Sequence, residues 1–400
     1  MENEKSNYKA GYQLVKTESD KELLITTIIL VVVGLLAVVS ASMPLCISRK
    51  LPPFYYVNQH LFWIFCGSVG MWICSRLDFN SLKKITLGFT FAVIILLLIV
   101  KFTPLGVTIN GARRWLDIGF IRFQPSEFTK PAIIMLMGSL LSMKKEFLLQ
   151  NLPKYLLTAG VMVFIVLKQP NLSMTLILLG TAFCMYLCSG KTLKYVYIGL
   201  ALLICIFGMI MTGIIDLSNF IEPYQWERLF NWIKAIFTGK SFDIQNGGYQ
   251  VFHSLIAISS GGFLGCGYGG GKEKLGWLPE SHTDFIFSVI SEEIGFIGSL
   301  FIILLFMTLL YRGINIALKC PSKYGQLLAI GITLSITIQA FFNISVATSL
   351  LPATGITLPF ISYGGSSLLV SMSMTGVLLN ISKTRMVRSI SPDTSINNRL

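Results

Sequence analysis

The chain has 400 residues, of which 53% are hydrophobic and only 13% are charged. Soluble domains carry about 25% charged residues, so this composition excludes a water-soluble globular enzyme and indicates an integral membrane protein. A net charge of +13 would suggest nucleic-acid binding in a soluble chain. In a membrane protein, basic residues flank the spans and meet anionic lipid, so we expect no nucleic-acid partner.

Apolar runs long enough to cross a bilayer recur along the whole chain. A transmembrane helix needs about 20 predominantly apolar residues. This criterion predicts an all-α polytopic membrane protein whose transmembrane domain covers residues 24–382, with an N-terminal tail at 1–23 and a C-terminal tail at 383–400. The ten expected helices lie near residues 24–45, 59–76, 85–102, 127–143, 155–168, 171–189, 195–215, 284–311, 324–348 and 365–382.

The distribution of basic residues predicts the orientation of these spans. Ten spans place both termini on one side of the membrane, and the segments on that side carry 19 of the 32 Lys and Arg residues. By the positive-inside bias, both tails are then cytoplasmic. Of the remaining 13 basic residues, ten lie in two segments, 101–130 and 216–283, which this topology places outside the cytoplasm.

Segment 216–283 is predicted to be a large extracytoplasmic loop between helices 7 and 8. Apolar residues recur at helical spacing over 226–237, which favours a helix lying in the membrane interface or one covering the top of the bundle. Its glycine-rich run, 261–271, matches a dinucleotide pattern, but it does not join a strand to a helix and is not expected to bind nucleotide. It indicates a tightly turning backbone.

Segment 110–130 carries a cluster of cations on the side where topology does not favour them. Arg113, Arg114 and Lys130 offer donors suited to phosphate oxygens. They predict a phosphate-bearing substrate. The structural alternative is that these cations only pair with Asp117 and Glu127.

Segment 279–293 places four acids and a histidine across a junction between loop and span. Glu280 and Asp284 are four residues apart, so one helical turn would put them on the same face. Glu292 and Glu293 are expected deeper, inside hydrocarbon, where ionisable groups are costly and functional by default. The alternative is that this deeper pair ties spans together.

Segment 351–367 joins the last two expected spans with turn-forming and small residues. Pro359, Gly364 and Gly365 belong to it, followed by Ser366. Small residues let a backbone approach a neighbour or a ligand closely. Alone, this segment indicates only a re-entrant turn. The three histidines of the chain are too scattered to predict a zinc site.

Together, the motifs NGARRWLDIG, QPSEFTKP, PESHTDFIFSVISEEIG and LPATGITLPFISYGGSSLL resemble the SEDS family (shape, elongation, division and sporulation). These proteins are polytopic membrane glycosyltransferases that polymerise the lipid-linked disaccharide lipid II into peptidoglycan. The resemblance covers about residues 24–382, and the motifs look more like the division member than the elongation member. It also implies ten spans and cytoplasmic termini.

The resemblance implies a set of site residues. Asp284 matches the presumed catalytic residue, at the mouth of a cavity beneath the outer loop. Substrate contacts are expected from Arg113, Arg114, Trp115, Lys130, Glu280, His282 and Ser366. Supporting roles are expected for Glu127, Glu292, Glu293, Pro359, Gly364 and Gly365. No metal ligand is firmly assigned, although a divalent cation, Mg or Mn, could assist the leaving group.

The implied reaction is displacement of a polyprenyl diphosphate from a sugar by a second sugar's hydroxyl, with Asp284 as general base and inversion at the anomeric carbon. A class B penicillin-binding transpeptidase and other division membrane proteins are the implied partners. The implied location is the plasma membrane, at the division septum, or a plastid inner membrane. A lipid-linked sugar flippase, with Glu292 and Glu293 as proton relay, and a non-catalytic division scaffold remain the alternatives.

Overall fold

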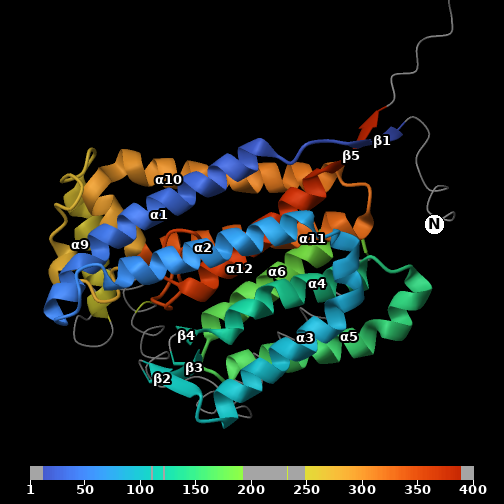
Figure 1. The fold of residues 1–400 in the computed structure, drawn as a ribbon, viewed down its shortest axis with the longest axis horizontal. Helices are drawn as coiled ribbons and strands as arrows, with labels where there is room; N and C mark the ends of the chain where they lie inside the picture. Colours follow the sequence, from blue (N-terminus) through green and yellow to red (C-terminus); the bar gives the residue numbers. More distant parts are fainter. Residues whose placement is uncertain (1–11, 110, 120–121, 192–231, 233–247, 389–400) are drawn as a thin grey trace, which may run out of the picture.

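The computed structural model describes residues 12–109, 111–119, 122–191, 232 and 248–388. Most of these residues lie in helices that run side by side along one axis (Figure 1). In chain order the longer helices are α1 (Lys21–Ser48), α2 (Tyr55–Arg76), α3 (Phe79–Phe102), α4 (Thr129–Leu141), α5 (Lys145–Leu167), α6 (Leu172–Cys188), α9 (Tyr249–Gly261), α10 (Ile286–Lys319), α11 (Lys323–Ala347) and α12 (Gly365–Ser382). Two single-turn helices, η2 (Pro125–Phe128) and η5 (Glu273–Leu275), accompany them.

Six of the described helices are long and apolar enough to cross a membrane, namely α1, α3, α10, α11, α12 and the Gln150–Leu167 part of α5. The prediction of an all-α polytopic membrane protein is confirmed. The helices α2, α4 and α6 coincide with further predicted spans. The predicted seventh span, 195–215, lies outside the described residues, and so does the predicted interfacial helix, 226–237, apart from residue 232.

Polar residues at the ends of the apolar runs begin several of these helices. The carboxylate of Asp20 accepts from the backbone N–H of Leu23 (3.0 Å) and so caps α1. Asp78, Asn171 and Ser322 cap α3, α6 and α11 in the same way. Each cap satisfies a backbone donor that the helix itself leaves without a partner. The observed starts of α1, α6 and α11 lie within three residues of the predicted ones, whereas α3, α5 and α10 each differ from the prediction by six to ten residues at one end.

Small residues let α12 pack closely along α2. A methyl group at Gly376 would lie 2.3 Å from the carbonyl oxygen of Met71, and one at Gly67 would lie 2.6 Å from the sulfur of Met372. Close approach of backbones at small residues is the usual way in which membrane helices associate. The close packing of α12 along α2 therefore fixes the position of the cavity-lining residues at the start of α12.

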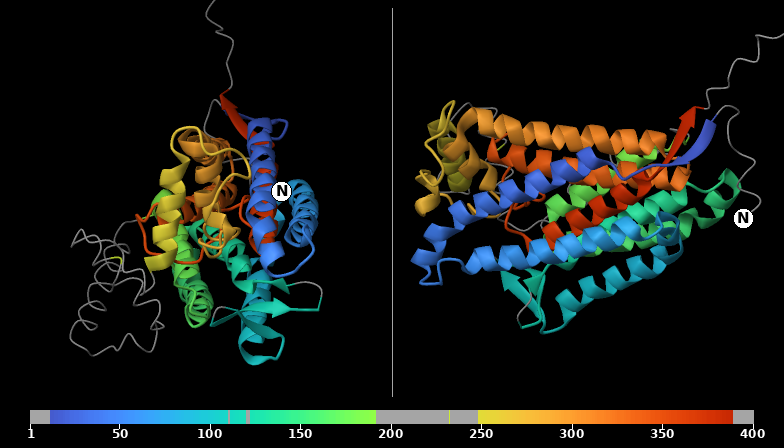
Figure 2. Two further views of the ribbon diagram at one scale, coloured as in Figure 1. Left: turned by 90° about the vertical axis from the view of Figure 1, so that its left-hand side faces the viewer. Right: turned by 45° about the horizontal axis from the view of Figure 1, so that its top comes forward.

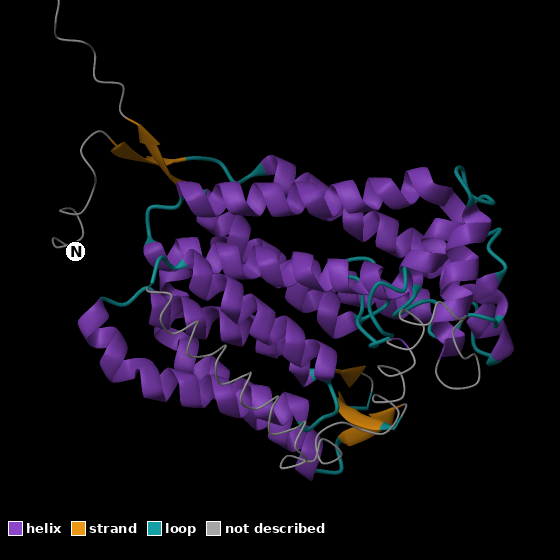
Figure 3. Cartoon of the chain, turned by 180° about the vertical axis from the view of Figure 1, so that it is seen from behind, coloured by secondary structure: helices purple, strands orange, loops and turns teal. Residues whose placement is uncertain are grey.

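Two small antiparallel sheets lie at opposite ends of the bundle (Figure 3). One pairs β1 (Tyr12–Lys16) with β5 (Thr384–Arg388), so the two described ends of the chain lie side by side (Figure 2). The other joins β2 (Gly106–Ile109), β3 (Ala112–Asp117) and β4 (Arg122–Phe123). The sequence of 101–130 indicated only a loop, so this sheet was not predicted. Burial along β3 does not alternate strictly, and the sequence of this strand carries no clear period-2 pattern that would have predicted it.

Helix α10 is broken at Gly295, whose backbone angles are φ 67° and ψ −165°. The glycine-rich run 261–271 docks on this break: the N–H groups of Cys266 and Gly267 donate to the carbonyls of Glu292 and Glu293, each at 3.0 Å. A methyl group at Gly265 would lie only 2.1 Å from the Glu293 carbonyl oxygen. The run thus turns tightly against another backbone, and it satisfies the carbonyls that the break leaves open.

Glu292 and Glu293 are both buried beside this break. A carboxylate oxygen of Glu292 accepts from the backbone N–H of Lys272 at 2.7 Å. Glu293 forms an ion pair with Lys274 of η5 and accepts from the hydroxyl of Ser40 in α1 at 2.5 Å. These contacts tie α10 to α1 and to the loop, which is the structural alternative considered for this pair.

Candidate active-site cavity

A cavity of about 300 Å³ opens at the end of the bundle that carries α9 and the β2-β3-β4 sheet (Figure 1). Its walls come from segment 112–127, from the α5–α6 turn, from the turn before α10 and from the segment before α12. Residues from the three segments 110–130, 279–293 and 351–367 therefore line the same cavity. The residues that line it include Arg114, Trp115, Glu127, Glu280, Thr283, Asp284, Gly355, Thr357, Tyr363, Gly364, Ser366 and Ser367.

Asp284 lies in the turn that leads into α10 and lines the cavity, half-buried. Its backbone N–H donates to the carbonyl of Glu280 (3.1 Å), and its own carbonyl accepts from the side-chain amide of Asn343 (2.7 Å). A methyl group at Gly355 would lie 3.4 Å from its carboxylate oxygen. The backbone of Asp284 is thus fixed by α11, and its carboxylate reaches the glycine of the opposite loop.

Glu280 lines the same wall one turn earlier, as its spacing from Asp284 predicted. A carboxylate oxygen accepts from the hydroxyl of Thr283 at 3.0 Å. Its φ angle is +54°, in the left-handed region that residues other than glycine seldom occupy. Such strained positions gather at functional sites because the surrounding structure must enforce them.

His282 is buried behind the wall and is not among the lining residues. Its ring contacts the rings of Tyr56 and Tyr363, at centroid distances of 5.1 and 5.6 Å, and its carbonyl accepts from the N–H of Tyr363 (3.0 Å). Burial lowers the pKa of His282 to about 4. Tyr363, which sequence reasoning did not select, lines the cavity instead.

The two adjacent arginines of β3 point to different places. Arg114 lines the cavity together with Trp115, and its Nε donates to the carbonyl of Gln169 at 2.9 Å. A second donor, Nη2, reaches the carbonyl of Pro170. Arg113 is exposed and donates to the carbonyls of Gly106 (3.1 Å) and Thr103 (2.5 Å). The structure brings Arg114 to the site but leaves Arg113 outside it.

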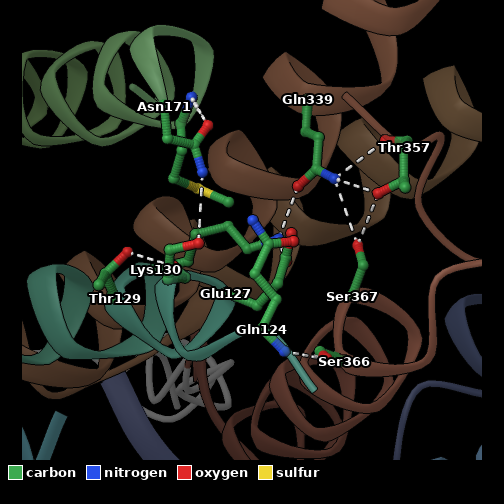
Figure 4. Close-up of polar contacts among 11 residues, drawn as sticks. Gln124, Glu127, Thr129, Lys130, Asn171, Gln339, Thr357, Ser366 and Ser367 are labelled. Carbon is green, nitrogen blue, oxygen red and sulfur yellow. Dashed lines mark hydrogen bonds and ion pairs between the residues drawn. The ribbon is translucent and has the colours of Figure 1, made fainter. Parts of the chain in front are cut away.

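Lys130 does not reach the cavity directly. It is 1% exposed, and its ammonium group lies 2.5 Å from a carboxylate oxygen of Glu127 and 2.6 Å from the amide oxygen of Gln339 (Figure 4). Glu127 lines the cavity, whereas Lys130 sits behind it. Pairing with Glu127 was the structural alternative for this lysine. Gln339, in the middle of α11, was missed because a single Gln in an apolar run gives no spacing signal.

The start of α12 closes the cavity. Gly364 and Ser366 line it, and the hydroxyl of Ser366 accepts from the backbone N–H of Gln124 at 2.8 Å. A methyl group at Gly365 would lie 2.2 Å from the ring of Trp63, so only glycine fits there. Pro359 is buried in the preceding turn. The small residues of this segment thus serve close approach, as predicted.

The lining is acidic overall. Among the described lining residues, Arg114 is the one cation, against the carboxylates of Glu127, Glu280 and Asp284. No group of three His, Cys, Asp or Glu within the described ranges could hold a metal ion. Mg²⁺, however, is often held by one or two carboxylates plus the phosphates of a substrate, and Asp284 with Glu280 would suit that arrangement.

Comparisons with known proteins identify the family to which the chain is similar. The family model FTSW_RODA_SPOVE, described as cell cycle protein, matches residues 21–386. The chain is 36% identical over 370 residues to a probable peptidoglycan glycosyltransferase FtsW of Geobacter sp. (strain M18), covering 92% of this chain and 97% of that one. It is 35% identical over 375 residues to stage V sporulation protein E of Bacillus subtilis (strain 168), covering 92% and 98%.

Solved structures show the same fold. A chain of a peptidoglycan synthase complex, described as coordinating polymerization and crosslinking, superposes with a TM-score of 0.70 at 26% identity, covering 91% of this chain and 97% of that one. The rod shape determining protein RodA of Thermus thermophilus superposes with a TM-score of 0.63 at 24% identity, covering 91% and 96%. The fold defines an all-α polytopic membrane protein. The chain belongs to the FtsW/RodA/SpoVE family.

Proposed function

We propose that this protein is a peptidoglycan glycosyltransferase that extends glycan strands from lipid II and releases polyprenyl diphosphate. The observation that carries the proposal is the carboxylate of Asp284, half-buried in a cavity at one end of the helix bundle. The names of the relatives, probable peptidoglycan glycosyltransferases, support the same activity. A helix bundle in lipid also suits a substrate whose tail stays in the membrane.

The chemistry follows from the groups in the wall. Asp284 removes the proton from the acceptor sugar's hydroxyl as that oxygen forms a bond to the anomeric carbon of the donor. The bond from that carbon to the diphosphate oxygen breaks, and the diphosphate leaves with the electron pair. Because a single carboxylate acts as base and no sugar-enzyme bond forms, the anomeric configuration inverts.

The leaving diphosphate needs positive charge or hydrogen-bond donors. Arg114 supplies the one described cation in the lining, next to three carboxylates. A divalent cation carried in with the diphosphate and held by Asp284 and Glu280 would offset that excess of negative charge. We therefore propose that Mg²⁺ or Mn²⁺ assists the reaction.

The proposal extends to the cellular role, the location and the partners of the protein. The FtsW relatives support a place in the division septum of the plasma membrane, while the sporulation relative keeps a second cellular role open. The synthase complex supports a class B penicillin-binding transpeptidase as partner, beside other division membrane proteins. Both tails are proposed to be cytoplasmic, from the distribution of basic residues.

Purified protein incubated with labelled lipid II tests the proposal. Glycan polymers should form in the wild type and disappear in Asp284→Asn, with lipid II binding retained. Adding a penicillin-binding partner shows whether the rate depends on it. Movement of lipid II across vesicles without any polymer would instead identify a flippase. If the protein shows neither polymerisation nor lipid II movement, the division scaffold is the remaining function.

A further inference from the structure

A chain of hydrogen bonds connects the buried Lys130 with the cavity wall at Ser367 (Figure 4). The ammonium group of Lys130 donates to the Gln339 amide oxygen at 2.6 Å. The amide nitrogen of Gln339 donates to the hydroxyl oxygen of Ser367 at 3.3 Å. Lys130 and Gln339 are each 1% exposed, whereas Ser367 lines the cavity.

Chemistry fixes the direction of this chain. An ammonium group has no acceptor, so the Gln339 atom that faces Lys130 must be the carbonyl oxygen. The amide nitrogen then faces the backbone carbonyl of Thr357 at 3.0 Å, and that carbonyl can only accept. Turning the amide around would lose both bonds in a buried site, where each unmet polar group is costly.

The Ser367 hydroxyl is the last member of the chain. Its oxygen accepts from Gln339 and also from the hydroxyl of Thr357 at 3.1 Å. A serine hydroxyl has two acceptor sites and one proton to donate. Both contacts use its acceptor sites, and Ser367 shares the two amide protons of Gln339 with the carbonyl and the hydroxyl of Thr357 (3.0 and 3.3 Å). The structure shows no acceptor for the remaining proton among the described residues, and Ser367 borders the cavity.

We propose that Ser367 donates this proton in a hydrogen bond to a phosphoryl oxygen of the substrate's diphosphate, and that Gln339 is the positioning residue that fixes its direction. This inference rests on the proposed function. Successive bonds that all point away from an ammonium group polarise one another and strengthen the last donor. An ionised oxygen also takes stronger hydrogen bonds than a neutral one. Through this chain, the positive charge of Lys130 strengthens a neutral hydroxyl donor in the wall of an acidic cavity.

Inhibition by a short-chain polyprenyl diphosphate tests this contact, since that product carries the diphosphate but no sugar. Ser367→Ala should raise its inhibition constant roughly tenfold or more, the loss expected for one hydrogen bond to a charged group. Ser367→Thr keeps the hydroxyl and should restore much of the affinity. Ser371→Ala is the matched control, because the Ser371 hydroxyl, one turn further along α12, has no partner among the described residues.

Gln339→Glu tests the direction of the chain. The new carboxylate would still face Lys130 but can only accept, so it would draw the proton of Ser367 away from the cavity. The inhibition constant should rise as it does in Ser367→Ala, and the double variant should be no worse than either single one. Gln326→Glu is the control: it makes the same change on α11, where Lys323 lies 3.1 Å from the amide oxygen.

Three outcomes would overturn the inference while polymerisation by the wild type upholds the proposed function. The first is an unchanged inhibition constant in Ser367→Ala, even with polymerisation reduced, because the hydroxyl would then contact another part of the substrate. The second is equal behaviour of Ser367→Ala and Ser371→Ala. The third is a double variant, Ser367→Ala with Gln339→Glu, whose inhibition constant rises by the product of the two single fold-changes. Gln339 would then act independently of Ser367. Should Gln339→Glu fail to fold, the Ser367 variants still decide the matter.

Discussion

Lys274 and Glu293 form an ion pair in which both side chains are 4% exposed. The pair joins the short helix η5 to the break in α10, and the Ser40 hydroxyl of α1 lies within 2.6 Å of the lysine nitrogen. The segment 265–274 is therefore anchored to the bundle by charge as well as by backbone hydrogen bonds. This contact brings together residues from three segments, namely α1, η5 and α10.

Lys274→Met should destabilise the protein strongly, because it leaves the carboxylate of Glu293 buried without its counter-charge. Breaking a buried pair by removing one partner costs about 3–5 kcal/mol. Thermal unfolding in detergent measures the loss, and Lys272→Met, at an exposed position whose backbone contact is kept, is the control. Adding Glu293→Met to Lys274→Met should recover part of the stability. Equal unfolding temperatures for all variants would contradict a structural role.

Gly265→Ala should weaken the docking of the glycine-rich run on α10. The methyl group would lie 2.1 Å from the Glu293 carbonyl oxygen, at a φ angle of +82°. Gly269→Ala is a matched control because its φ angle is +81° and nothing lies within 4 Å of the added methyl group. The difference between the two unfolding temperatures then reports the clash alone. A larger loss in Gly269→Ala would show that backbone strain, and not packing, dominates.

Asp284→Asn should lower polymerisation of lipid II by at least about 10²-fold, since the amide cannot take a proton at neutral pH. Unfolding temperature and lipid II binding should stay near those of the wild type. Asp117→Asn, which removes an exposed pair with Arg122 at 2.8 Å, is the control and should remain active. Full activity of purified Asp284→Asn would refute its role as base.

The two arginines of β3 should differ in their effect on activity. Arg114→Ala should reduce turnover and loosen the α5–α6 turn, because its guanidinium both lines the cavity and holds the carbonyl of Gln169. Arg113→Ala should leave turnover near the wild-type value, since Arg113 bonds to carbonyls outside the cavity. Initial rates at several lipid II concentrations measure both. Equal losses would indicate that the whole strand, and not one side chain, matters.

His282 should make stability depend on pH in the mildly acidic range. Its pKa is about 4 in the folded protein, against 6.5 for an unperturbed histidine, because burial disfavours the charged ring. As the pH falls from about 6.5 toward 4, the unfolded chain gains a proton that the folded protein does not, so stability falls over that window. Unfolding temperatures of the wild type and of His282→Gln, compared across this range, should differ in slope. Parallel profiles would contradict a neutral buried ring.

Much of the candidate site was predictable because its residues lie where apolar runs end. Asp284 and Glu280 precede α10 by less than two turns, and Arg114 precedes α4, so membrane boundaries alone brought these segments to one side. The direction of each side chain was not predictable in the same way. Arg113 and Arg114 diverge because neighbours on a strand face opposite sides, and the short sheet that separates them was not recognised.

Other parts of the site depend on contacts that no local pattern contains. Gln339 lies 18 residues from Thr357 and 209 from Lys130 along the chain, and only the packing of α11 against α4 makes it their common partner. Tyr363 lines the cavity and His282 lies behind it, and both rings pack against Tyr56. Chain spacing carries no information on either point.

The sheet of β1 and β5 has a consequence for how this chain can be rearranged. Lys16 pairs with Thr384 in register, so residues near the two ends of the transmembrane domain are already neighbours. Because the ends are close, a short linker could join them and new ends could be opened in the turn at 320–322, between α10 and α11. Such a circular permutant would keep every helix contact described above. The packing of the helices therefore does not itself require the chain to begin at α1.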